Sequence, residues 1–219
     1  FIMKRWPMIV LLLWIFAAVL AALMDLKPNQ INLDLILAMP QNHHWLGCDD
    51  LGREILPRLL SGAQVSLWVV FVVTLVTATV GISLGLISGY YGGLVDRTLM
   101  QITDVFLAFP GILLAIAFAA VLGAGLNNLI LALCLTSWVG YARLTRAQAL
   151  SMRQRQHVMA AESLGASVPR IMFKHMLPLL AAPLLVEATY SMAGLVIAVT
   201  AVPGLLLSPF MGSLIDSFG

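Results

Sequence analysis

The stretch RQRQHVMAAESLGASVPRIMFKHMLP, residues 153–178, is the one long polar island between strongly apolar runs of this chain. Residues 160–164 favour a helix, Gly165 supplies the positive φ that ends a helix, and Pro169 fits the first turn of a new one. The stretch therefore predicts a helix, a turn and a second helix. Between two membrane spans such an element lies outside the bilayer. Its small residues let the backbone of another protein approach the bend, so we expect a docking surface there.

The composition is typical of a polytopic membrane protein. Hydrophobic residues make up 61% of the chain and charged residues 10%, and the mean hydropathy is +0.98. The apolar runs approach the ~20 residues that a helix needs to cross a bilayer. The net charge of +2 is too small to predict nucleic-acid binding. Cys48 and Cys134 fall in different predicted compartments, so neither a disulfide nor a paired-cysteine metal site is expected.

Five apolar runs are expected to span the membrane, at about residues 6–24, 65–88, 99–122, 129–142 and 179–200. Lys4 and Arg5 precede the first run, which favours a cytoplasmic N-terminus. Residues 25–62 then lie outside, and residues 143–178 lie in the cytoplasm. Nine basic residues fall on the predicted inner side and three on the outer side, in agreement with the positive-inside rule.

The polar island resembles the cytoplasmic loop of importer-type ABC permeases, which sits in a groove of the ATPase subunit. Met159 stands where the family signature opens with Glu, and Leu179 stands where Asn often follows Leu-Pro. The alternative is an ordinary loop of another polytopic protein, because Ala-Ala-x-x-x-Gly alone is a weak match. The matching residues are Ala160, Ala161, Gly165, Ala166, Ile171, His175, Leu177 and Pro178. The resemblance implies that the ATPase contacts a coupling segment made of Ala160, Ala161, Glu162, Ser163, Leu164, Gly165 and Ala166.

A second stretch, WLGCDDLGRE at residues 45–54, resembles permeases for dipeptides, oligopeptides and nickel. The order and spacing of the residues in those permeases continue here through Arg58, Gly62-Ala63 and Ser66-Leu67. Three residues differ from the permease pattern: Cys48 replaces a Thr, Glu54 replaces an Asp, and Pro57 replaces a Ser. We interpret Asp49, Gly52 and Arg53 as a structural motif that supports a gate.

The residues of this stretch also predict local structure. Asp49 or Asp50 is able to cap the following turn, and Gly52 permits that turn. Apolar residues recur at helical spacing as in a short amphipathic helix on the membrane, namely Leu51, Ile55, Leu59 and Leu60. His43 and His44 are candidate metal ligands, but adjacent histidines point in divergent directions, which favours ordinary surface residues. No metal site is predicted.

Small and ionisable residues mark the later spans. Gly81 and Gly85, four residues apart, are expected to pack closely against another span or a partner permease. Asp104 and Pro110 match the resemblance, and we interpret Asp104 as a structural anchor, with Arg97 as a candidate partner. Glu187 is a candidate for the substrate path together with Ser191, or a residue that pairs near the inner face, because a carboxylate in a span is costly.

We therefore identify the chain as a permease subunit resembling those of binding-protein-dependent ABC importers for peptides or nickel. The resemblance implies an all-α membrane bundle, a single permease domain over residues 1–219, and a sixth span that is missing here. It also implies a bacterial inner-membrane location, a second permease subunit, two ATPase subunits and an external solute-binding protein, besides membrane lipid. No G-x-x-x-x-G-K-[ST] occurs, so the chain is not expected to be an enzyme or to bind a cofactor, and ATP and Mg belong to the ATPase subunits.

Three other classes remain as alternatives. A secondary transporter is expected to show inverted repeats, and none is visible. A channel needs a filter or a charged ring, and a membrane enzyme needs clustered reactive groups, whereas the ionisable residues here are scattered.

Overall fold

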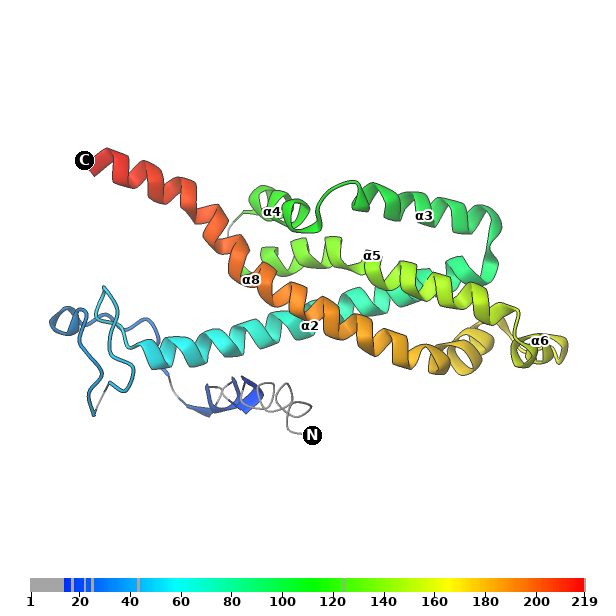
Figure 1. Cartoon of the computed structure of the whole chain (residues 1–219), viewed down its shortest axis with the longest axis horizontal. Helices are drawn as coiled ribbons and strands as arrows, with labels where there is room; N and C mark the ends of the chain where they lie inside the picture. The colour runs from blue at the N-terminus through cyan, green and yellow to red at the C-terminus, as the bar shows by residue number, and fades with distance from the viewer. Residues whose placement is uncertain are drawn as a thin grey trace, which may run out of the picture. The chain divides into compact units, whose positions relative to one another are not determined.

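The computed structural model describes residues 14–16, 18–21, 23–24, 26–42, 44–123 and 125–218, with side chains as far as residue 199. Every long element in these ranges is a helix (Figure 1). The predicted all-α class is therefore confirmed. Much of the first predicted span, residues 6–24, lies outside the described residues, as do Lys4, Arg5 and His43.

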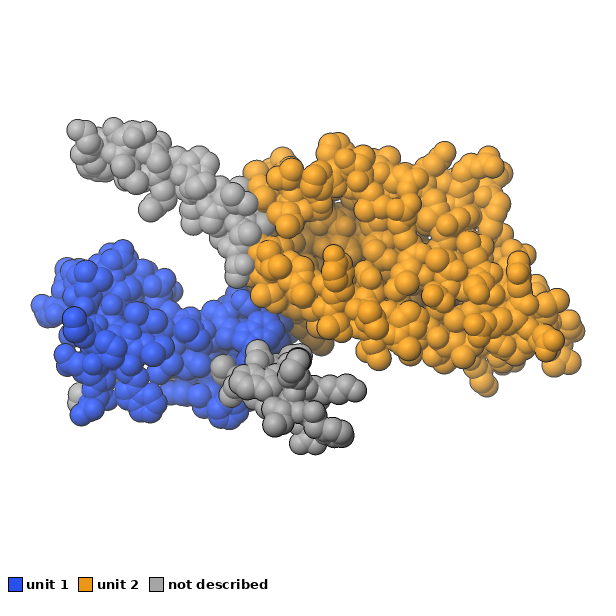
Figure 2. Space-filling model, viewed as in Figure 1, with its two compact units in different colours: residues 1–69 blue, residues 70–219 orange. Residues whose placement is uncertain are grey.

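The chain forms two compact units, residues 1–69 and 70–219 (Figure 2). In the first unit a short 3-10 helix, η1 (Leu33–Leu35), and two isolated bridges precede helix α2 (Ile55–Tyr91). The apolar residues from Ile55 onward belong to this long helix, so the expected short amphipathic helix is not a separate element. Gly62 lies between these apolar residues and the predicted span 65–88, and it does not interrupt the helix. One internal glycine costs a helix only about 1 kcal/mol relative to alanine.

The second unit begins inside α2 and contains the remaining helices. α3 (Gly93–Leu107), α4 (Gly111–Leu122), α5 (Leu126–Arg153) and α6 (Gln156–Ser163) come first. A short α7 (Val168–Arg170), a π-helical turn η2 (Ile171–Met176) and a 3-10 turn η3 (Leu177–Leu180) then lead into α8 (Ala181–Phe218). Helix α5 is central, since it contacts α3, α4, α6 and α8 (Figure 1).

The third predicted span, residues 99–122, is two helices and not one. α3 and α4 are bent by 82° at the break between them. Pro110 explains the break, because it lacks an N–H group and disfavours the helical conformation of Phe109 before it. Among the described residues, Ile55–Tyr91 and Val168–Val199 are long and apolar enough to cross a membrane, and the bent pair adds a third such stretch if it is counted as one. The predicted span 129–142 lies within α5.

Glycines on α2 let its backbone touch α5. A Cβ added at Gly81 would lie 2.5 Å from the carbonyl oxygen of Trp138, and one at Gly85 would lie 2.5 Å from that of Ala142. The predicted close packing at these two positions is confirmed, and the partner is another helix of the same chain. Van der Waals contact of this kind is a main source of helix association in membranes, where lipid is as apolar as the helices.

Candidate functional site

Helix α6 and the turn after it form the candidate docking surface. The Gly165 N–H donates to the Glu162 carbonyl at 2.9 Å, and the Ala166 N–H donates to the Ala161 carbonyl at 3.0 Å. These two bonds make a Schellman motif, which ends a helix in a defined direction. Gly165 has φ +77°, as predicted. A residue with a Cβ would pay about 1–2 kcal/mol to adopt that conformation.

The surface of this bend is largely neutral. Leu164 is 87% exposed and Met159 is 54% exposed, and Ala160, Ser163 and Gly165 are exposed beside them. Glu162, also exposed, is the one acidic residue of α6. A protruding apolar side chain on a rigid turn is suited to fill a pocket in a partner protein.

Two of the seven predicted coupling residues face inward. Ala161 is 9% exposed and shares one helix face with Val158, three residues earlier. Ala166 is half-buried against the same cluster. The cluster draws on α2, α5, α6, η2 and η3, and comprises Leu86, Tyr90, Ala149, Met152, Val158, Ala161, Ile171, Met172, Met176 and Leu180. The candidate docking surface is therefore the outer face of a helix whose inner face is buried in a core.

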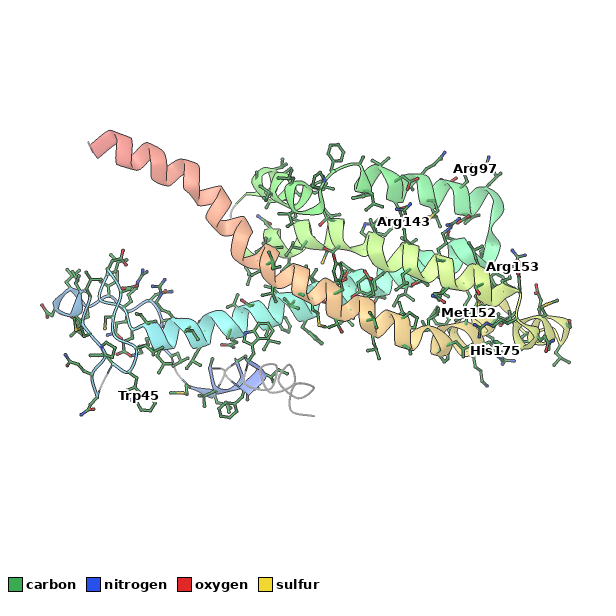
Figure 3. The ribbon with its side chains drawn as sticks, in the orientation of Figure 1. Trp45, Arg97, Arg143, Met152, Arg153 and His175 are labelled. Carbon is green, nitrogen blue, oxygen red and sulfur yellow. The ribbon has the colours of Figure 1, made fainter. Side chains whose placement is uncertain are left out.

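Tyr90, at the end of α2, makes polar contacts with α6 and with the end of α5. Its hydroxyl donates to Glu162 Oε1 at 3.5 Å, and the guanidinium carbon of Arg153 lies 5.9 Å from the ring centroid. Arg153 and Met152 lie at the α6 end of α5 (Figure 3). Sequence reasoning missed Tyr90, because a tyrosine at the end of an apolar span carries no sign of a partner 72 residues away.

Two ion pairs join α3 to α5. Arg143 Nη2 donates to Asp104 Oδ1 at 3.0 Å, and Arg146 Nη2 donates to Asp96 Oδ2 at 2.6 Å. Arg97, the partner considered for Asp104, lies on α3 itself, whereas Arg143 comes from α5 (Figure 3). The pairing therefore crosses between helices. The side chains of Asp104 and Arg143 are 60% and 50% exposed, so this ion pair contributes little to the stability of the fold.

Asp49 organises the segment before α2. Its Oδ1 accepts from the N–H groups of Leu51 at 2.9 Å and Arg53 at 2.8 Å, and its Oδ2 pairs with the Arg53 and Arg58 guanidinium groups. Burial raises the pKa of this carboxyl, but the bonds from Arg53 and Leu51 outweigh it and hold the pKa below its ordinary value. Gly52 has φ +69°. Of the two capping candidates, Asp49 is the one that caps the turn, and Gly52 permits that turn as predicted.

His44 faces Glu54, with 3.0 Å between His44 Nδ1 and Glu54 Oε1. Within the described residues no group of three His, Cys, Asp or Glu side chains is arranged to hold a metal ion. His43 lies outside them.

Glu187 and Ser191 on α8 face α5. A Cβ added at Gly140 would lie 2.5 Å from Glu187 Oε1, so the carboxylate occupies the space that a side chain would fill. Ser191 lies one turn after Glu187 on the same face of α8, and Tyr141, next to Gly140 on α5, is 1% exposed. Glu187 is half-buried. The two candidate substrate-path residues therefore lie together at a helix contact.

A family model described as "Binding-protein-dependent transport system inner membrane component" matches residues 81–217. This match begins at Gly81, one of the two α2 glycines that pack against α5, and includes α6 and the turn after it.

Several curated proteins are similar over most of the chain. A glutathione transport system permease protein of Pectobacterium atrosepticum is 43% identical, covering 68% of this chain and 50% of its own length. A dipeptide transport system permease protein of Alkalihalophilus pseudofirmus is 40% identical, covering 82% and 58%. A nickel transport system permease protein of Escherichia coli (strain K12) is 37% identical, covering 86% and 70%. The chain spans about half the length of the first of these relatives.

Proposed function

The chain belongs to the family of binding-protein-dependent transport system inner membrane components, and from that premise we propose that it is a permease subunit of an ABC importer. The observation that carries the proposal is the rigid bend at α6, where Leu164 protrudes from a helix whose other face is buried. With a second permease subunit, the chain forms a path for the uptake of peptides or of nickel and other metal chelates. Relatives named for peptides and for nickel support this range of substrates.

The energy for transport comes from other subunits in this proposal. Two ATPase subunits bind ATP and Mg, receive the α6 bend, and close against each other, while an external solute-binding protein delivers the substrate. This chain contributes no hydrolytic chemistry. Its role is to convert movement of the ATPase subunits into movement of helices.

We place the protein in the bacterial inner membrane with its N-terminus in the cytoplasm. Residues 25–62 then face outward and residues 143–178 face the ATPase subunits. The surplus of basic residues on the inner side supports this orientation.

Crosslinking tests the proposal directly. Cys48 and Cys134 are the two native cysteines, so both are first replaced by serine, and single cysteines are then introduced at Ala160 and Ser163, which are exposed on α6. We expect a short bifunctional reagent to join each of them to a co-expressed ATPase subunit. A cysteine at Thr98, exposed on α3, serves as the matched control and should remain unjoined. Failure of both α6 cysteines to reach an ATPase, with the chain at normal levels in the membrane, would contradict the proposal.

Glu187 and Ser191 border the substrate path in this proposal. Glu187→Gln keeps the shape of the side chain and removes its charge, so we expect uptake of a cationic substrate to fall about threefold to tenfold while the complex still assembles. The measurement is the initial uptake rate against substrate concentration in proteoliposomes. Thr189→Val is the control. Thr189 is exposed on the same helix, and its hydroxyl donates to the backbone carbonyl of Leu185, one turn earlier. Unchanged uptake by Glu187→Gln would leave the carboxylate with a purely structural role against α5.

A further inference from the structure

The end of α2 contacts three neighbouring helices through three consecutive residues. Ser88 Oγ donates to Asp96 Oδ1 of α3 at 2.5 Å. Gly89 lies against α5, where an added Cβ would be 2.5 Å from Ala149 Cβ. Tyr90 reaches Glu162 of α6. Successive side chains of a helix point in directions about 100° apart, so one turn of α2 faces all three helices.

The contact of Tyr90 with α6 is both polar and apolar. The side chain is 8% exposed and packs in the same buried cluster as Val158 and Ala161 of α6. Arg153 lies over one side of the ring, and the Tyr91 ring meets it edge-on at 5.5 Å between centroids. A buried tyrosine hydroxyl needs a hydrogen-bond partner, and Glu162 supplies it from the docking helix. Tyr90 is thus joined to α6 by its ring and by its hydroxyl.

We infer that Tyr90 is a positioning residue that transmits displacement of α6 to α2. The inference rests on the proposed function, since it assumes that an ATPase moves α6. The chain itself connects α6 only to α5 and, through α7, η2 and η3, to α8. Leu86 of α2 lies in the same buried cluster as Val158 and Ala161, and Tyr90 adds to this apolar packing a hydrogen bond to Glu162. Because close-packed contacts shift as units and do not deform continuously, a displaced α6 carries the end of α2 with it, together with the parts of α3 and α5 that Ser88 and Gly89 contact.

Three variants separate the parts of this contact. Tyr90→Phe removes the hydroxyl bond to Glu162 and keeps the ring. Tyr90→Ala removes the ring as well. Tyr91→Phe is the matched control, because Tyr91 is the adjacent tyrosine, is 56% exposed, and keeps its ring contact with Tyr90 in this variant. Each is assembled into the complete transporter with its ATPase subunits and solute-binding protein, and reconstituted in liposomes.

The readout is the amount of substrate transported per ATP hydrolysed, because a purely structural defect lowers both rates together. We expect this ratio to fall about threefold in Tyr90→Phe and about tenfold in Tyr90→Ala, the range expected for residues on a coupling route. ATPase subunits should copurify normally, and Tyr91→Phe should match the wild type. If Tyr90→Ala does not fold, Tyr90→Phe decides the question, and it should lower the ratio.

The result that overturns the inference is an unchanged ratio in Tyr90→Phe and in every other folded Tyr90 variant while the wild-type transporter is active. A wild-type chain that recruits no ATPase subunit would contradict the proposed function instead. The two failures are therefore distinguishable in one set of preparations.

Discussion

Replacing Gly165 by glutamate is expected to abolish ATP-driven uptake while leaving membrane insertion intact. Gly165 has φ +77° and nothing within 4 Å of the position where a Cβ would be. A glutamate side chain would therefore point into the space that a partner must enter, and would add a negative charge beside exposed Leu164. The backbone conformation adds a cost of about 1–2 kcal/mol for any residue with a Cβ. We expect uptake to fall more than about tenfold, measured as substrate accumulated in reconstituted vesicles that contain ATP.

Asparagine at the same position separates backbone strain from occlusion. Asparagine adopts the left-handed conformation more readily than other residues with a Cβ, and it is shorter and uncharged. Gly165→Asn should therefore keep much of the uptake and should still retain the ATPase subunits on purification. Equal loss in both variants would mean that the turn geometry, and not the docking surface, is what the glutamate disturbs. Normal uptake by Gly165→Glu would remove this bend from the coupling site.

Replacing Gly85 by leucine is expected to prevent α2 from packing against α5. An added Cβ would lie 2.5 Å from the carbonyl oxygen of Ala142 and 2.6 Å from Thr145 Cβ. The first is a backbone atom, and it cannot move without displacing α5, which contacts most of the other helices of its unit. The smaller change Gly85→Ala should destabilise the chain by about 2 kcal/mol, or about 5 °C in Tm for a chain of this size. Leucine should leave almost no folded protein.

Thermal unfolding in detergent measures the effect, with Gly194→Ala as the control. Gly194 lies in helix α8 with nothing within 4 Å of its added Cβ, so alanine there should be neutral or stabilise the helix by up to about 1 kcal/mol. A Gly85→Ala variant that unfolds at the wild-type Tm would show that α2 and α5 do not touch at this position.

The sequence by itself determined the features that depend on neighbouring residues. The apolar runs predicted an all-α membrane protein, and the spacing of Gly81 and Gly85 predicted a close helix contact. Gly165 predicted the turn after α6, because only glycine adopts a positive φ there without strain. Asp49 and Gly52 predicted the turn before α2 for the same local reason. The resemblance of residues 160–178 to importer permeases agrees with the family match, which covers residues 81–217.

Only the tertiary structure decided which face of each helix is used. Ala161 and Ala160 are adjacent alanines, yet one is buried and the other exposed, because the rotation of α6 is set by the core that Val158 enters. The pairing of Asp104 with Arg143 and the contact of Tyr90 with Glu162 likewise join elements far apart in the chain, and the direction of α4 after the break at Pro110 depends on its packing against α5. A proline in an apolar run either bends a span or ends a helix, and an acid pairs with whichever base faces it. Both outcomes depend on how all the helices pack together, which no local pattern specifies.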